Sequence, residues 1–269
     1  MEIESSFSMP SILQKSCFIL CLFCASLPAL AAPPASFSTP VSAETKKATD
    51  DIAVALIDRN RMFSQVDPLI KAIFDAMGAN NPSFALLEKD FPGMTDNIIQ
   101  AMRPIMLKEI DLIIPQYRAE ISAFYAQKLT AVEARQVADF WISSVGQNFI
   151  VALNNNMKFD SMANDYAAKE AATPEGFRKD AGMASIKTIS ALGADERKAI
   201  LGFITAPTGR KLMALNVEKN KIDIKWSNYA SPQAIEDIQK VVIDAMAAFI
   251  QKSENSPTSS TTKLQNVAL

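Results

Sequence analysis

The segment Thr208-Gly209-Arg210-Lys211 carries residue types that suit the binding of an anion. It follows Pro207, and proline is common at the first position of a helix. Backbone N–H groups at a helix start would therefore lie beside two cationic side chains, an arrangement that favours a bound anion. An ordinary solvated helix start accounts for the same residues, and both interpretations stay open at this stage.

Carboxylates offer a second chemistry. Two of them at a suitable separation hydrolyse a glycosidic bond by general acid–base catalysis. Glu133 and Glu196 are a candidate pair because they occupy equivalent positions in two related segments. Helix capping explains both residues more simply, since a glutamate in the first turn accepts a backbone N–H.

Two further groups of side chains have a binding and a packing interpretation. Met102 and Met106 share a helix face and offer thioethers to copper(I), although methionine in such a stripe also fills a hydrophobic core. Trp226 and Tyr229 lie near lysines and suit a peptide or glycan contact. An amphipathic helix that packs its aromatic residues explains them equally well.

Other chemistries are excluded by composition. The chain has no histidine, and all three cysteines lie among its first 24 residues. Serine catalysis assisted by histidine, thiol catalysis and ordinary zinc sites are therefore ruled out in the chain that follows. Gly-rich phosphate loops are absent as well, so we expect no cofactor.

A motif that occurs twice, at residues 129–146 and 192–209, is the strongest feature of the sequence. The two copies are related by a constant offset of 63, and five of their eighteen positions are identical. The identical pairs are Leu129 and Leu192, Ala131 and Ala194, Glu133 and Glu196, Phe140 and Phe203, and Gly146 and Gly209. We interpret the motif as a repeated fold unit.

The first copy predicts a helix, a break and a second helix. Thr130 and Glu133 have the spacing of a capping box, in which each side chain accepts a backbone N–H of the other residue. Phe140 and Trp141 follow on the apolar face, and we expect Phe140 to be a buried wedge. Gly146 after the break suits a left-handed or closely packed backbone.

The second copy marks the break with a proline. Pro207 cannot continue the preceding helix, Thr208 is expected to cap the next one, and Gly209 permits a close approach of the backbone. Glu196 and Phe203 are expected to cap and to wedge like their counterparts in the first copy.

The first copy also resembles the signature of the exported bacterial proteins catalogued as domain of unknown function 2059 (DUF2059). The residues that carry this resemblance are Tyr125, Leu129, Thr130, Glu133, Phe140, Trp141, Ser143 and Gly146. Trp141 stands where the family has tyrosine, and Ser144 stands where it has proline, which Pro207 retains in the second copy. The resemblance implies an exported helical fold, but no established activity and no catalytic residues.

The N-terminus has the pattern of an export signal at residues 1–31. Lys15 precedes an apolar stretch too short to span a bilayer comfortably, and Ala29-Leu30-Ala31 fits the cleavage pattern, which would leave Ala32 first. Met9 is an alternative start. The chain from Ala32 has 26 basic and 27 acidic residues, a balance that disfavours nucleic-acid binding.

The remainder is predicted to be one all-α, bundle-like domain at residues 49–252. Residues 32–48 are rich in Pro, Ser, Thr and Ala and indicate a flexible leader, and residues 253–269 indicate a disordered tail. No later stretch is apolar enough for a membrane span. Pro104 and Pro115 are expected to kink or separate helices.

These observations favour an exported, non-catalytic protein that binds or assists another component of the cell envelope. Its expected location is the periplasm, with secretion as the alternative. The partner, a protein or a ligand, cannot be named from the sequence. Two alternatives stay open, a carboxylate-dependent hydrolase of envelope polymers and a periplasmic carrier of a metal or small ligand.

Overall fold

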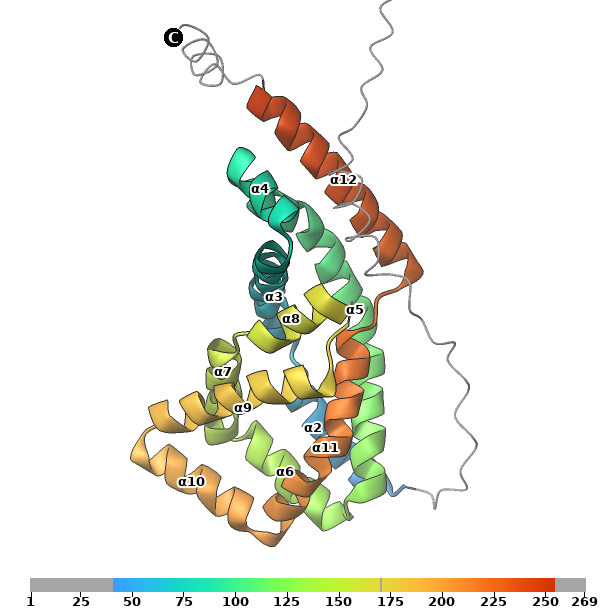
Figure 1. Ribbon diagram of the computed structural model, residues 1–269. Coiled ribbons are helices and arrows are strands. Elements are labelled where there is room, and N and C mark those ends of the chain that lie inside the picture. Colours follow the sequence, from blue (N-terminus) through green and yellow to red (C-terminus); the bar gives the residue numbers. More distant parts are fainter. Residues whose placement is uncertain (1–40, 170, 255–269) are drawn as a thin grey trace, which may run out of the picture.

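The computed structural model describes residues 41–169 and 171–254, and their regular secondary structure is entirely α-helical, as predicted (Figure 1). The expected signal at residues 1–31 lies outside the described residues. The helices are α2 (Ala43–Leu56), α3 (Arg59–Asn80), α4 (Pro82–Asp90), α5 (Met94–Lys128), α6 (Ala131–Ile142), α7 (Ser144–Asn156), α8 (Asp160–Lys169), α9 (Pro174–Ala191), α10 (Ala194–Thr205), α11 (Pro207–Ser227) and α12 (Pro232–Glu254).

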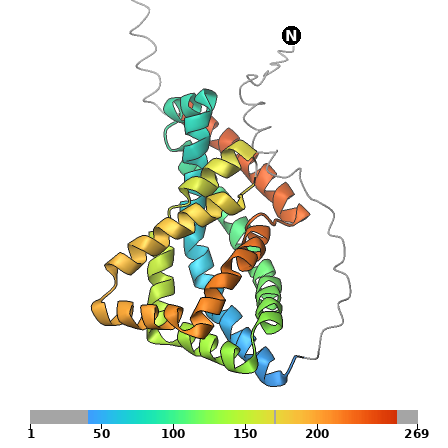
Figure 2. The ribbon, with the colours of Figure 1, turned by 60° about the horizontal axis from the view of Figure 1, so that its bottom comes forward.

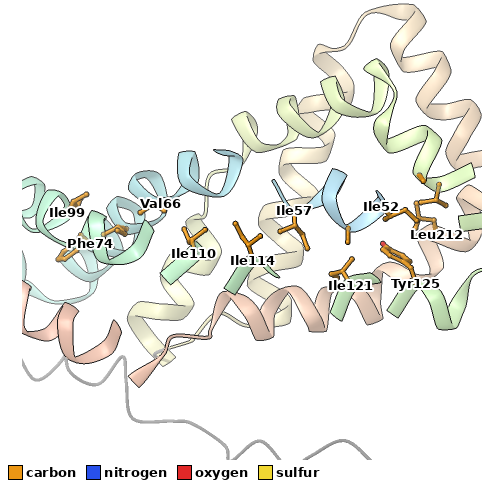
Figure 3. Close-up of a cluster of buried hydrophobic side chains, with 14 of the residues drawn as sticks. Ile52, Ile57, Val66, Phe74, Ile99, Ile110, Ile114, Ile121, Tyr125 and Leu212 are labelled. Carbon is orange, nitrogen blue, oxygen red and sulfur yellow. The ribbon is translucent and has the colours of Figure 1, made fainter. Parts of the chain in front are cut away.

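Helix α5 is the central element of the core. It packs against α2, α3, α11 and α12. Its buried side chains continue along its whole length, from Ile99 through Ile110, Ile114 and Ile121 to Tyr125, and Figure 3 shows them facing residues of α2 and α3. Fully burying one such side chain stabilises the folded state by about 1.5–3 kcal/mol. This row of side chains is therefore a main source of the stability of the core.

Pro104 and Pro115 are expected to kink or separate helices, and the prediction of a separation is wrong, because both lie inside the continuous α5. Each proline removes one backbone hydrogen bond within the helix. Both rings are exposed, so the carbonyl groups that lose their partners can bond to water. Packing of α5 on its neighbours then outweighs the local cost.

The predicted leader at residues 32–48 is also partly wrong. Residues 32–40 lie outside the described residues, but α2 begins at Ala43. The Ser42 hydroxyl accepts the backbone N–H of Thr45 at 3.1 Å, and Ala48 is buried in the core. A cap and an apolar face thus extend the helix into a segment whose composition indicates a linker. At the other end α12 reaches Glu254, and the rest of the predicted tail, residues 255–269, is outside the described part.

A hydroxyl residue followed by proline marks the start of a helix at two places. The Thr173 hydroxyl accepts the N–H of Gly176 at 3.1 Å, and the Ser231 hydroxyl accepts the N–H of Ala234 at 3.2 Å. The buried carboxylate of Glu109 on α5 accepts both the backbone N–H and the hydroxyl of Ser231. This contact fixes the turn between α11 and α12 to the core.

A smaller cluster of buried side chains lies around α8. It contains Phe159, Met162, Tyr166 and Ala172, and Ile73 of α3 packs against both this cluster and the main core. The two clusters are therefore continuous. Within residues 41–169 and 171–254 every helix lacks the combination of length and apolar character that crossing a bilayer requires.

Candidate functional site

The two copies of the repeated motif start in the same way, at the end of a helix. Leu129 is the C-terminal cap residue of α5, and Leu192 holds that place in α9. In the first copy the predicted capping box is present, since Glu133 N donates to Thr130 Oγ1 at 3.3 Å and Thr130 N donates to Glu133 Oε2 at 2.8 Å. Gly193 stands at the equivalent position of the second copy and has no side chain to cap α10.

The corner between the two helices of the first copy is formed at Ser143. This residue ends α6 and begins α7, and its hydroxyl accepts the N–H of Gly146 at 3.1 Å. A Cβ at Gly146 would lie 2.9 Å from Trp141 Cα and would overlap the Phe140 carbonyl oxygen. Glycine is therefore required by close backbone approach, and not by a left-handed conformation.

The second copy makes the same corner between α10 and α11, with α8 and α9 between the two copies. Ala206 ends α10 and begins α11, and Pro207 is the first residue of α11. A Cβ at Gly209 would lie 2.8 Å from Ile204 Cα, which repeats the constraint at Gly146. The prediction that Thr208 caps α11 is wrong, because Pro207 takes the first helical position and leaves the cap position to Ala206.

The two copies pack directly against each other through their equivalent phenylalanines. The rings of Phe140 and Phe203 stack at a centroid distance of 3.8 Å with an angle of 1° between their planes. Both side chains are half-buried, so the expectation of buried wedges is only partly met. Phe203 also packs against the main core. In the first copy it is Trp141, the neighbour of Phe140, that packs against this core.

The polar contacts around this stack are reciprocal. Lys211 Nζ donates to Glu133 Oε2 at 2.7 Å, and Asn148 Nδ2 donates to Glu196 Oε1 at 3.0 Å. The offset of 63 relates Glu133 to Glu196 and Asn148 to Lys211, so each contact is the image of the other with the copies exchanged. Such mutual contacts are the mark of a twofold interface, here formed within one chain.

This interface engages most of the predicted anion site. Lys211 is paired with Glu133, and the Thr208 hydroxyl donates to Gln136 Oε1 at 2.5 Å. Gly209 is buried at the corner, and Arg210 is exposed on α11. An internal carboxylate thus already neutralises one of the two cations that the anion was expected to meet.

The electrostatics of Glu133 favour its charged form. The Lys211 ammonium and the Thr130 backbone N–H hold the pKa of Glu133 below its ordinary value. A general acid needs the opposite shift, because it must keep its proton near neutral pH. Glu133 and Glu196 therefore act in this geometry as contacts between the copies, with Glu133 also capping α6.

A buried polar cluster between α5 and α11 was not predicted. Tyr117 Oη donates to Asp223 Oδ1 at 2.7 Å, and Lys219 Nζ donates to Asp223 Oδ2 at 2.6 Å. Burial and the nearby Asp223 carboxylate raise the pKa of Tyr117, so the phenol stays a hydrogen-bond donor. Nothing in the sequence distinguishes Asp223 from the exposed acids of other helices.

The aromatic pair considered for peptide or glycan binding belongs to the same region. Trp226 is buried, and its indole N–H donates to Glu120 Oε2 at 2.7 Å. Tyr229 lies 5.4 Å from Trp226 between ring centroids. Packing accounts for Trp226. Met102 and Met106 likewise pack against the main core.

No family model, curated protein or solved structure matches the chain. The resemblance to DUF2059 therefore stays a prediction from the motif itself.

Proposed function

We propose that this chain is an exported, non-catalytic helical protein that binds or assists another component of the cell envelope. The observation that carries the proposal is the engagement of Glu133 and Glu196, the recurring pair of carboxylates. Glu133 is bonded to Thr130 and Lys211, and Glu196 accepts the Asn148 amide. Both contacts hold helices together, which is the role expected of a scaffold.

The buried acids support the same conclusion. Asp180 accepts the backbone N–H groups of Ser161 and Met162 at the start of α8, and Glu109 binds Ser231. Asp223 is bonded to Tyr117 and Lys219. Their oxygens serve helix ends and neighbouring side chains, the usual partners of buried carboxylates.

Membership in DUF2059 and export to the periplasm belong to the proposal. They are supported by the Leu129–Gly146 motif and by the signal pattern that precedes Ala32. Expression of the full chain in a Gram-negative host, followed by mass spectrometry of the periplasmic fraction, tests this part. We expect a chain that begins at Ala32. A full-length chain retained in the cytoplasm would contradict the prediction.

Incubation of the purified chain from Ala32 with cell-wall glycan tests the non-catalytic role. We expect no release of soluble fragments. Release that is lost on substitution of a single carboxylate would overturn the proposal and establish the hydrolase alternative. A thermal screen with copper(I) and anions tests the carrier alternative, which predicts a higher Tm with the bound ligand.

A further inference from the structure

Positive charge is concentrated in the second half of the fold. The span from α9 to α11, residues 174–227, holds ten Lys and Arg against six Asp and Glu. The whole chain has 27 basic and 29 acidic residues, so the remainder is clearly acidic. A strong separation of charge on a nearly neutral chain sets up a field that orients the molecule toward an anionic partner.

Most cations of this span form no ion pair within the described residues. Six of them are exposed and form neither an ion pair nor a side-chain hydrogen bond within the described part of the chain; they are Arg178, Lys179, Lys187, Lys198, Arg210 and Lys221. Arg197 is also exposed and unpaired with any acid, but its guanidinium donates to the Leu192 carbonyl. Among the acids, Asp180 and Asp223 are buried and Glu218 is paired with Lys128. Lys211, Lys219 and Lys225 are paired as well, so the unpaired charge of α9–α11 keeps the same basic excess as its composition.

Large apolar side chains lie exposed on the same three helices. Their exposed fractions run from 44% at Leu201 to 70% at Val217, and the others are Met183, Ile186 and Met213. On α11 the order Arg210, Met213, Val217 and Lys221 has a spacing of three and four residues, which places two apolar side chains between two cations on one face.

These helices form a three-sided frame, with α10 at the end of the molecule opposite α4 (Figure 1 and Figure 2). Helix α11 contacts both α9 and α10. We call the exposed cations and apolar residues named above the basic frame. Its charges are spread over three helices, and so suit an extended anionic surface better than a single small anion.

We propose that the basic frame docks onto the surface of an anionic lipid bilayer. Exposed cations bind the headgroups, while the apolar side chains between them enter the boundary with the acyl chains, as in interfacial helices. An acidic polypeptide would pair with the cations, but it would bury less of the apolar surface of Met183, Ile186 and Val217. This inference rests on the proposed binding role and names its partner.

Vesicle sedimentation with the chain from Ala32, which contains every helix of the described core, tests the proposal. Phosphatidylcholine vesicles with and without phosphatidylglycerol are the probes. We expect binding only with phosphatidylglycerol, and weaker binding at high salt because screening shortens the reach of the charges. Neutralising one cation should lower the partition coefficient about five-fold, the equivalent of about 1 kcal/mol per Lys or Arg.

Matched variants locate the contact. Lys179→Gln with Lys187→Gln on α9, and Arg210→Gln with Lys221→Gln on α11, should each lower partitioning about 25-fold. Lys108→Gln with Lys240→Gln removes two exposed cations outside the basic frame and should have little effect. Ile186→Ser should weaken binding, whereas Val132→Ser, which alters a side chain of similar exposure on α6, should not.

Three results would overturn the proposal. They are absence of binding to phosphatidylglycerol vesicles at low salt, equal effects of the frame and control variants, and binding to soluble poly-glutamate that Ile186→Ser leaves unchanged. The last would assign the surface to an acidic polypeptide. The non-catalytic role is tested separately, by the release of fragments from cell-wall glycan. The vesicle experiment can therefore fail without overturning that role.

Discussion

The two copies of the repeated motif have the same backbone corner but different surroundings. In the first copy α6 packs against α2 and completely buries Ala134, Val137 and Ala138. In the second copy α10 buries only Ile200, the counterpart of Val137. The first copy is thus part of the core, and the second lies at its edge, held mainly by the first copy and by α11.

The difference separates what the motif specifies from what its context adds. The positions shared by both copies, such as Gly146 and Gly209, set the corner. The positions that differ set the environment, since Thr130 caps α6 while Gly193 leaves α10 without a side-chain cap. One structural unit can therefore serve at the core and at the surface of a single domain.

The largest expected effects test the shared corner. Gly146→Ala and Gly209→Ala should each destabilise the fold by about 3 kcal/mol, because the new Cβ meets backbone atoms that cannot move aside. Gly202→Ala is the control, since a Cβ there meets nothing within 4 Å. It should stabilise α10 by about 0.5–1 kcal/mol. Urea unfolding measures all three, and a tolerated alanine at either corner would contradict the close approach.

A comparison of the two phenylalanine variants should reveal the asymmetry between the stacked rings. Phe203→Ala should cost about 3 kcal/mol, because this ring packs on both Phe140 and the main core. Phe140→Ala should cost about half as much, because Trp141 makes the core contact of the first copy. Thermal and urea unfolding compare the two variants. A larger loss for Phe140→Ala than for Phe203→Ala would contradict the view that the second copy relies on the first for its packing.

The two equivalent glutamates should also differ in how much they contribute to stability. Glu133→Ala should cost about 1 kcal/mol, because it removes a capping bond and a partly exposed ion pair with Lys211. Glu196→Ala should cost at most about 0.3 kcal/mol, because it removes one exposed contact with Asn148. Equal losses in urea unfolding would argue against a difference in capping between the copies.

The smallest expected difference is in how the stability of the unaltered chain and of the Glu133→Gln variant falls in acid. Because its pKa is lowered in the folded state, Glu133 contributes stability that is present above its ordinary value of 4.5 and is lost as pH falls through the folded value. The Glu133→Gln variant should therefore lose stability less steeply in acid than the unaltered chain. Parallel curves of unfolding free energy against pH would contradict a lowered pKa. Since the chain has no histidine, both curves should be flat from about pH 5.5 to 8.

The sequence predicts local features of this fold well. The all-helical class, the capping box at Thr130 and the start of α11 at Pro207 follow from spacing and from hydroxyl or proline residues at helix ends. These features depend on a few neighbouring residues. Where tertiary packing decides, prediction fails, as in the unbroken α5 through Pro104 and Pro115.

The candidate site was less predictable for the same reason. A constant offset of 63 indicates two equivalent units, but it cannot indicate that Phe140 stacks on Phe203. Nor does it indicate that Lys211 turns toward Glu133 instead of solvent. Both contacts depend on how α10 and α11 return to α6 and α7, which is a long-range property of the chain.

The central claim is that the two copies stabilise each other across a pseudo-twofold interface, and a double-mutant cycle on Phe140 and Phe203 tests it most directly. The free energies of unfolding of Phe140→Ala, Phe203→Ala and the double variant are compared with that of the unaltered chain. We predict a coupling energy of about 0.5–1.5 kcal/mol between the rings. The same cycle on Phe140 and Phe74, whose ring lies tilted against Phe84 in the main core, should be additive within about 0.3–0.5 kcal/mol. Additivity of Phe140 with Phe203 as well would contradict the claim.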